Sequence, residues 1–416
     1  MRDGSIRLGR TGNSTEQTLA QIAAEPAPSE RRVSGRLDSV DLLRGIVMVV
    51  MALDHVRDFF TDVRFQPLDL SQTTLALGLT RWVTHFCAPV FVFLAGTGAF
   101  LSLTRGKTRR ELSLFLLTRG VWLVVLELTV VRFGWFLNFD YSFDIGQAIW
   151  AIGCSMIVLS GLIYAPPLLI TLFGVAMILL HNLADGIDPG TLGIFGWPWQ
   201  ILHTGGPIQY FPGHVFAAVY PLVPWIGVMA AGYGFGGILQ LDERARRRTL
   251  MRLGLGLTLA FIVLRLTNFY GNPHPWAAQK SAALTVLSFI NCEKYPPSLL
   301  YLLMTLGPAI ALLPVLERWK GFGSNFFLTF GRVPLFYYVL HIPLVHAIAV
   351  VAGFLTGYNP GFMFANVPPW EWPAGYGFSL PVVYAVWISV VLLLYPVCRM
   401  YAEFKRKHKS VWLSYL

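Results

Sequence analysis

The sequence predicts an all-α membrane protein, a polytopic bundle of about ten transmembrane helices with both termini in the cytoplasm. Of its 416 residues, 55% are hydrophobic and only 13% are charged, whereas a soluble globular protein carries about 25% charged residues. Mean hydropathy is +0.57, and apolar segments long enough to cross a bilayer recur along the chain. The ten expected spans are residues 37–60, 82–104, 112–136, 145–164, 166–183, 214–239, 249–268, 296–316, 331–355 and 379–402.

The connections between these spans alternate in charge. Basic or mixed-charge segments are residues 105–111, 242–248, 317–320 and 405–409. The connections between these segments are poor in Lys and Arg and rich in Trp, Pro, Gly and Tyr. They comprise residues 61–81, 137–144, 184–213, 269–295 and 356–378. Because Lys and Arg concentrate in cytoplasmic loops, this alternation places both termini inside. It also accounts for the net charge of +10 without a nucleic-acid partner.

The chain divides into three expected parts. Residues 1–36 are rich in Arg, Ser, Thr, Glu, Ala and Pro and lack an apolar run, which predicts a disordered cytoplasmic tail. Residues 37–402 are expected to form one transmembrane domain, and residues 403–416 a basic cytoplasmic tail. No CxxC pair occurs among the four cysteines, so neither a disulfide framework nor a metal site is expected.

The first span carries ionisable groups at both ends of its apolar middle. Asp41 and Arg44 precede that middle, and Asp54, His55 and Asp58 follow it. At about 100° per residue, Arg44 and His55 lie on nearly one face, and a rise of about 1.5 Å per residue separates them by roughly 16 Å. Ionisable groups at membrane depth are costly and usually functional. This favours a functional site over charges that only mark the two membrane surfaces.

Polar residues in other spans are candidates for the same site. His85 is expected near His55, because the loop between their helices is short, and the two rings are interpreted as a base and its orienting partner. A structural hydrogen bond is the alternative for His85. Lys294, before the eighth span, either faces an oxyanion or carbonyl oxygen or reaches to the membrane surface. Candidate substrate contacts, some of which could instead serve packing, are Arg81, Gln147, Asn268, Tyr295, Tyr338 and His341.

Two other spans carry features that are expected to be structural. Glu127 and Arg132 are five residues apart, which is a poor spacing for a pair within one helix, so a salt bridge to another helix is expected. Pro221 and Pro224 are expected to break the sixth helix near its start, where freed carbonyl groups need protein or a cavity beside them.

Five segments together resemble a known family. They are SVDLLRGIVMVVMALDHVRDFF, THFCAPVFVFLAGTGAF, YPLVPWIGVMAAGYGFG, KYPPSLLYLLMTLGPA and GRVPLFYYVLHIPLVHA. In this order they are similar to the bacterial membrane proteins grouped with the catalytic domain of heparan-α-glucosaminide N-acetyltransferase, within a broader transmembrane acyltransferase superfamily. The resemblance covers about residues 36–402. The first segment is also similar to the bacterial acyltransferases that decorate cell-surface glycans.

The resemblance implies acyl transfer from cytoplasmic acyl-CoA to an acceptor handled at or across the membrane. The positions that match its motifs are Asp41, Arg44, Gly45, His55, Lys294 and His341. Among them, His55 matches the catalytic histidine of the surface-glycan acyltransferases. The chain departs from the lysosomal heparan-α-glucosaminide N-acetyltransferase in two places. His85 stands where that enzyme has an acidic residue, and residues 61–81 hold no clear counterpart of the segment that carries its active histidine. Heparan is therefore not the expected substrate.

The expected function is therefore an acyl-CoA-dependent O- or N-acyltransferase, with acetyl-CoA as co-substrate and no metal. Phosphate groups bind arginine and lysine, and the residues expected to hold the coenzyme are Asp41, Arg44, Arg105, Lys107, Arg109 and Arg110. His55 would remove the acceptor's proton, with Asp54 or Asp58 orienting the ring. Lys294 or Tyr338 would face the oxyanion. Direct transfer and an acyl-histidine intermediate both remain open.

The expected location is the bacterial inner membrane. The expected partners are the lipid bilayer, acyl-CoA and a glycan or other envelope acceptor, with no nucleic acid and with a homodimer left open. Two other classes of protein fit part of the pattern: a transporter or flippase for a glycan or lipid precursor, and a non-catalytic scaffold. The lack of internal repeats counts against the first, and ionisable groups in apolar surroundings count against the second.

Overall fold

A computed structural model describes residues 1, 37–408, 410, 413 and 415. The tail expected to be disordered, residues 1–36, lies outside the described residues apart from Met1. The described residues from Leu37 onward belong to one compact unit of the chain.

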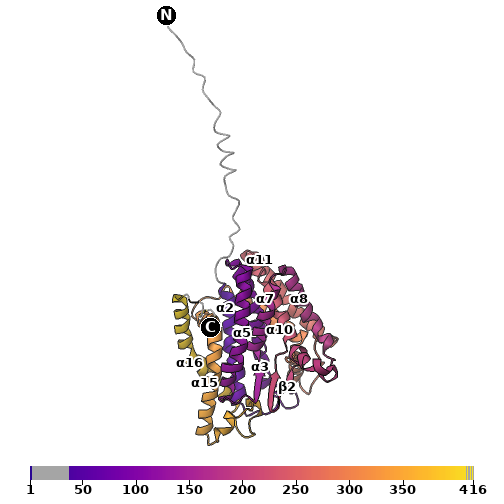
Figure 1. Ribbon diagram of the computed structural model, residues 1–416, viewed down its shortest axis with the longest axis vertical. Coiled ribbons are helices and arrows are strands. Elements are labelled where there is room, and N and C mark those ends of the chain that lie inside the picture. The colour runs from indigo at the N-terminus through magenta and orange to yellow at the C-terminus, as the bar shows by residue number, and fades with distance from the viewer. Residues whose placement is uncertain (2–36, 409, 411–412, 414, 416) are drawn as a thin grey trace. The chain divides into compact units, whose positions relative to one another are not determined.

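Helices make up most of this unit and run roughly alongside one another (Figure 1). The α-helices are α2 (Asp38–Phe60), α3 (Leu75–Thr84), α4 (Cys87–Thr104), α5 (Arg109–Leu126), α6 (Arg132–Phe136), α7 (Ala148–Leu162), α8 (Pro167–Leu180), α9 (Gly196–Trp199), α10 (Leu222–Phe235), α11 (Glu243–Thr267), α12 (Ala282–Ile290), α13 (Leu299–Leu316), α14 (Phe322–Arg332), α15 (Pro334–Leu355) and α16 (Leu380–Lys407). Short π- or 3-10-helical segments are η1 (Glu127–Val131), η2 (His181–Ala184), η3 (Pro189–Phe195), η4 (Gln200–Thr204), η5 (Ile238–Gln240), η6 (Pro360–Phe364) and η7 (Pro369–Glu371).

Within the described residues, eight helical segments are long and apolar enough to cross a membrane. They are α3 with α4, α5 to α6, α8 with η2, α10 with η5, α11, α13, α15 and α16. Helices α2 and α7 occupy the other two expected places, but α2 carries several charged side chains and α7 has only 15 residues. The unit is thus mainly helical as expected, and ten crossings with cytoplasmic termini stay a prediction.

The described residues are mostly helical, as expected, and a small sheet that was not predicted adds to the helices. Strand β1 (Phe143–Gly146) pairs in parallel with β3 (His214–Ala218), which pairs antiparallel with β2 (Gly206–Phe211). The sixth span was expected to begin at residue 214, but α10 begins at Leu222. Pro221 is its N-cap and Pro224 lies in its first turn, where proline breaks no intrahelical hydrogen bond.

Three further boundaries differ from expectation. Helices α12 and α14, which lie in or beside expected loops, were not predicted. Helix α16 continues to Lys407, so the start of the expected tail, residues 403–416, is helical. The second span begins earlier than expected, because α3 starts at Leu75 and the chain turns at residues 85–86 before α4.

Helix α2 lies at the centre of the bundle and packs against α3, α4, α13, α14, α15 and α16. Most of its 23 residues are buried. At its first turns, α2 and α14 touch backbone to backbone, because a Cβ on Gly45 would overlap the carbonyl oxygen of Phe327 and one on Gly331 that of Asp41. Small residues permit such close helix contacts in membrane proteins. The crossing fixes the position of Arg44, which follows Asp41 by one turn.

The loops that are poor in Lys and Arg meet in one layer at the end of α2 that carries Phe60. Thr61 forms a β-bridge with Phe378, the Asn291 side chain donates to the carbonyl oxygen of Leu68 at 3.3 Å, and the sheet joins β1 to the β2–β3 hairpin. We call these connections the loop layer. The basic segments gather at the other end, the basic end, where Arg246 and Arg247 both pair with Glu317. The basic connections and the connections poor in Lys and Arg thus lie at opposite ends of the bundle, which agrees with the alternation predicted from the sequence.

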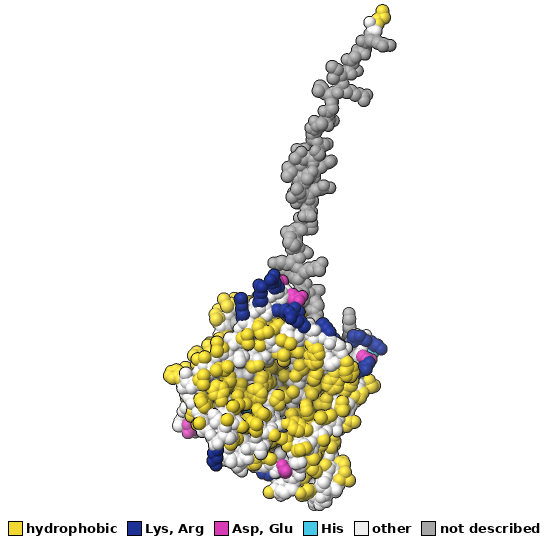
Figure 2. Space-filling view, turned by 180° about the vertical axis from the view of Figure 1, so that it is seen from behind, with side chains coloured by type: hydrophobic (Ala, Val, Ile, Leu, Met, Phe, Trp, Pro, Cys, Tyr) yellow, Lys and Arg dark blue, Asp and Glu magenta, His cyan; other side chains and the backbone are white. Residues whose placement is uncertain are grey.

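Between these ends the surface is apolar. Figure 2 shows a broad hydrophobic face with Lys and Arg side chains gathered along one edge. Exposed side chains on α8, α11 and α16 include Leu168 at 67%, Leu259 at 61% and Met400 at 71% of full exposure. An apolar surface of this extent fits contact with lipid, because soluble proteins rarely expose one.

Candidate active site

A first cavity, of about 260 Å³, lies beside the first half of α2. Its walls come from α2, α4, α5, α7 and α15, and most of its lining is apolar, including Met48, Leu94 and Leu123. It reaches from Arg44 and Ser102, toward the basic end, to Tyr338. We call it the inner cavity.

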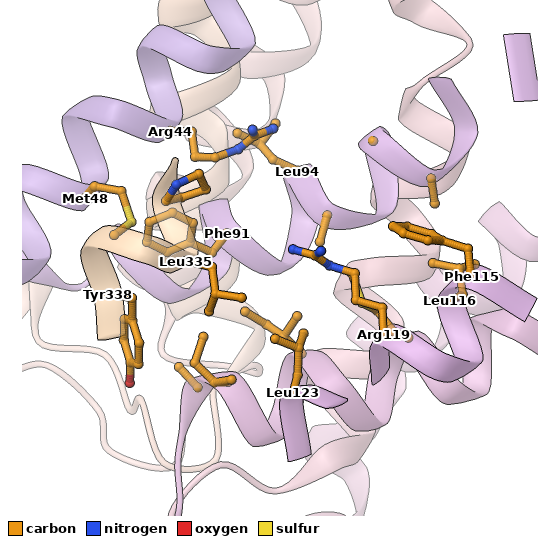
Figure 3. A pocket seen from close by; sticks show the side chains of 18 of the residues that line it. Arg44, Met48, Phe91, Leu94, Phe115, Leu116, Arg119, Leu123, Leu335 and Tyr338 are labelled. Carbon is orange, nitrogen blue, oxygen red and sulfur yellow. The ribbon is translucent and has the colours of Figure 1, made fainter. Parts of the chain in front are cut away.

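Two arginines face this cavity from different helices. Figure 3 shows the guanidinium groups of Arg44 on α2 and Arg119 on α5 directed toward the same space. Arg44 also donates to Asp41 at 3.2 Å and to the carbonyl oxygen of Gly331 at 3.3 Å. Both contacts are made by Nη1, which holds one edge of the guanidinium group against the α2–α14 crossing. The inner cavity therefore combines two cationic groups with an apolar wall.

A second cavity, of about 420 Å³, lies at the other end of α2. Its lining is polar and aromatic and comes from α2, the loop layer and the helix ends beside it. The residues are Asp54, His55, Arg57, Asp58, Thr61, Val63, Arg64, Phe65, Gln66, Pro67, Arg81, Trp135, Gln147, Val219, Tyr220, Tyr295 and Trp370. We call it the outer cavity.

The two cavities come close to each other halfway along α2 and share no lining residue. At the start of α7, Gln147 lines the outer cavity and the next residue, Ala148, lines the inner one. The Tyr338 ring, on the inner side, lies 6.1 Å from the ring of His55, on the outer side. A wall about one side chain thick thus separates them, and His55 is part of it.

The partner of His55 is His341, on α15. Nδ1 of His55 lies 2.6 Å from Nε2 of His341, and the two ring planes differ by 15°, with centroids 4.8 Å apart. The edge of Trp135 packs against His55 at 5.3 Å. The expected pairing of His55 with His85 is wrong. Because the chain turns at residues 85–86, the ring of His85 packs against Tyr301, and His85 lines neither cavity.

Asp54 is bound by cations instead of orienting His55. Its carboxylate accepts two hydrogen bonds from Arg81, at 2.6 and 2.7 Å, and a hydrogen bond from Thr84 at 3.0 Å. It also pairs with Arg57 at 2.9 Å and with Lys294 at 3.8 Å. These partners on three elements lock the end of α2 to α3 and to the chain before α13.

Asp58 is held in a similar way, because its carboxylate accepts from Arg57 at 2.6 Å. The expectation that Asp54 or Asp58 orients the His55 ring is therefore corrected: the nitrogen that would receive such a contact faces His341.

Most of the other expected substrate residues line one of the two cavities, and one lines neither. Arg81, Gln147 and Tyr295 line the outer cavity, and Tyr338 lines the inner one. Asn268 lies apart from both cavities, where its side chain exchanges two hydrogen bonds with the backbone of Trp276 and closes the end of α11.

The basic rim lies beside the inner cavity and not in its wall. Its members, Arg105, Lys107, Arg109 and Arg110, are exposed. Lys107 lies 3.9 Å from the ring centroid of Phe115, which lines the inner cavity. Arg109 donates to the carbonyl oxygen of Tyr164. The rim is thus placed near the inner cavity, while the arginines that line it are Arg44 and Arg119.

The expected salt bridge for Glu127 and Arg132 is half right. Arg132 pairs with Asp144 at 3.0 Å, but this partner lies in strand β1 and not in a helix. Burial raises the pKa of Asp144, and its contacts with Arg132 oppose that effect. Glu127 accepts a hydrogen bond from the backbone N–H of Trp150 at 3.0 Å, so it caps the start of α7.

Sequence reasoning assigned no role to several lining residues. Arg119 had a usable signal, since it shares one face of α5 with Phe115 and Leu123 at helical spacing, and a cation on that buried stripe is costly unless used. Trp135 and Trp370 carried weaker signals, because Trp135 meets His55, and Trp370 meets Trp135, from elements that are remote in sequence. Arg57 pairs with Asp54 and Asp58 of its own helix.

A model of the family described as heparan-alpha-glucosaminide N-acetyltransferase, catalytic, matches residues 36–268. This is more than half of the chain. The chain belongs to this family. A search of curated proteins found no match. The matched region contains Arg44, His55 and Arg119, whereas Lys294, Tyr338 and His341 lie beyond it. The family is one of membrane acetyltransferases, which agrees with the expectation from the five segments.

Proposed function

We propose that this protein is an integral membrane acyltransferase that moves an acyl group, most simply acetyl, from cytoplasmic acyl-CoA to a hydroxyl or amine of a glycan or other envelope acceptor. The observation that supports the proposal best is the position of His55, in the thin wall between a cationic, apolar inner cavity and a polar, aromatic outer cavity. Two substrates bound from opposite sides would meet at this residue.

The inner cavity fits the donor. Arginine forks bind phosphate oxygens, and Arg44 and Arg119 offer two of them at one end of the cavity. The eleven residues from Arg44 to His55 span roughly 16 Å along α2, which matches the length of an extended pantetheine arm. A thioester anchored at the two arginines would thus reach the wall at Tyr338 and His55.

The outer cavity fits a sugar. Trp135, Trp370 and Tyr220 present aromatic faces, and Arg64 and Gln147 present planar polar groups. Sugar rings have apolar faces and polar edges, so such walls suit them. Among the described residues the buried Nε1 of Trp135 has no hydrogen-bond partner, which leaves a donor for an acceptor molecule to satisfy.

The reaction needs one base and one site for negative charge. His55 takes the proton from the acceptor's hydroxyl or amine as that atom forms a bond to the thioester carbon. The carbon–sulfur bond then breaks, and the departing thiolate takes the proton from His55. Tyr338, which lines the inner cavity beside His55, would stabilise the oxyanion, whereas Lys294 lines neither cavity and pairs with Asp54. An acyl-histidine intermediate would give the same net proton balance.

The location follows from this arrangement. We propose the bacterial inner membrane, with the basic end in the cytoplasm, where acyl-CoA is made, and the loop layer on the envelope side. The alternative of a transporter or flippase is not favoured, because the family is one of acetyltransferases.

The test is the variant His55→Ala. Since loss of a general base typically costs about 10²–10⁴ in rate, transfer from labelled acetyl-CoA to an envelope glycan extract should fall at least about a hundredfold, with acetyl-CoA binding retained. The matched control is His274→Ala, in the loop layer, whose side chain is 78% exposed. A well-folded His55→Ala protein that keeps more than about a tenth of wild-type transfer would remove His55 from the mechanism.

A further inference from the structure

We propose that His341 is the positioning residue of His55, and that it holds His55 in the tautomer whose Nε2 lone pair is free for the acceptor. The inference rests on the proposed function and deepens it. It assigns the orienting role, usually taken by a carboxylate, to a neutral imidazole that is anchored to a backbone carbonyl.

The backbone beside His341 determines which of its ring nitrogens carries the hydrogen. Its Nδ1 lies 3.1 Å from the carbonyl oxygen of Tyr337, one turn earlier in α15. A carbonyl oxygen only accepts hydrogen bonds, so Nδ1 of His341 carries the hydrogen. In a neutral imidazole, Nε2 is then the acceptor.

The acceptor nitrogen of His341 determines which nitrogen of His55 carries a hydrogen. Nδ1 of His55 lies 2.6 Å from the Nε2 acceptor of His341, so the Nδ1 of His55 must be the donor. Neutral His55 then has its lone pair on Nε2. Among the described residues, the His55 side chain makes no other hydrogen bond, and it lines the outer cavity.

The surroundings hold His341 in place. Its side chain is fully buried, and the rings of Tyr337 and His55 lie nearly parallel to it, with centroids 5.2 and 4.8 Å away. Tyr338 packs against its edge at 5.5 Å. A buried ring that packs against three others and has a partner at each nitrogen cannot turn without displacing a neighbour, so its nitrogen atoms keep their directions.

The carboxylates near His55 are engaged elsewhere. Asp54 accepts from Arg81 and pairs with Arg57 and Lys294, and Asp58 accepts from Arg57. Burial of the His341 ring disfavours a positive charge on it, which keeps it neutral. In the reaction His55 gains its proton on Nε2, while its Nδ1–H stays donated to His341, and no proton moves to His341.

Three variants test this role by activity. His341→Gln keeps an acceptor oxygen near the position of Nε2, whereas His341→Leu removes it. His346→Leu is the matched control, because His346 is also a fully buried histidine of α15 that contacts a backbone carbonyl. We expect His341→Leu to lower kcat about 10–100-fold, as loss of orienting partners does, with an unchanged KM for acetyl-CoA. His341→Gln should restore most of the rate, and His346→Leu should keep it.

A second readout is independent of activity. Nitrogen-15 spectra of histidine-labelled protein in nanodiscs distinguish the two neutral tautomers, and the His55 signal is assigned by its loss in His55→Ala. The wild type should show a protonated Nδ1 and a bare Nε2, and His341→Leu should shift the signal toward the other tautomer. A wild-type signal with the proton on Nε2 would overturn the inference.

Failure of the inference is distinguishable from failure of the proposed function. If transfer depends on His55 but the Leu and Gln variants of His341 match the His346→Leu control, His341 has no positioning role and the function stands. If the wild type neither binds nor uses acetyl-CoA, the function fails, while the spectrum still decides the tautomer.

Discussion

At the scale of single residues, the proposed binding of acyl-CoA depends most on Arg44 and Arg119. They reach one cavity from two helices, and hydrogen bonds between charged groups contribute about 1.5–3 kcal/mol each. We therefore expect Arg119→Gln to raise the KM for acetyl-CoA at least about tenfold, which corresponds to about 1.4 kcal/mol, with little change in kcat. Titration calorimetry and steady-state kinetics measure the two effects.

The control for this change is Arg399→Gln on α16, whose side chain is 64% exposed and pairs only with Glu403 among the described residues. It removes the same charge without touching the cavity. Equal affinity in Arg119→Gln and wild type would leave Arg119 as a structural charge and would place the phosphate groups on the exposed rim.

Single residues also show what the sequence could predict. Helical spacing placed Arg44 and His55 on one face of α2, and both line cavities. The partner of His55 could not be found in this way, since His341 is 286 residues away and only the packing of α15 on α2 brings the rings together. The same packing left His85 out, because the direction of its ring depends on the turn between α3 and α4.

At the scale of elements, the inner cavity depends on small residues in α4. Gly98 lines this cavity, and no atom of the described residues lies within 4 Å of the place where its Cβ would be. A leucine there would enter the cavity without disturbing a helix contact. We predict that Gly98→Leu raises the KM for acetyl-CoA at least about tenfold, because the added side chain competes with the pantetheine arm for the same volume. Thermal unfolding should show no loss of stability.

The matched control is Gly256→Leu in α11, an exposed glycine whose Cβ would also have no atom within 4 Å in the part of the chain that the structure describes. Both changes place a better helix former inside a helix, but only one fills the cavity. Identical kinetics for the two variants would mean that the donor binds somewhere else.

The apolar pattern of the sequence predicted the long helices but not the small sheet. The long apolar helices were predicted well, since an apolar run of about twenty residues is typical of a membrane-spanning helix. Strand β3 was missed because His214–Ala218 is a short apolar run directly before a helix, and such runs do not distinguish strand from helix. Its pairing with β1 and β2 is tertiary, and it places Val219 and Tyr220 in the outer cavity wall.

At the scale of the whole molecule, charge is separated between the two ends of the bundle. This separation defines the sides from which the donor and the acceptor are proposed to enter. Basic segments lie at one end, the loop layer lies at the other, and each cavity belongs to one end. This two-ended organisation could be predicted from the alternation of loop composition. The thin wall at the middle could not, because it is made by side chains from α2, α7 and α15 that meet only in the folded bundle.

The central claim is that the donor enters from the basic end and the acceptor from the loop layer, with His55 between them. The most direct measurement uses sealed inside-out and right-side-out membrane vesicles from cells expressing the protein, with labelled acetyl-CoA added outside and envelope glycan or glucosamine as acceptor on the other face. The account predicts label on the acceptor in inside-out vesicles alone, and none with His55→Ala. Equal labelling from either face, or labelling that survives His55→Ala, would contradict it.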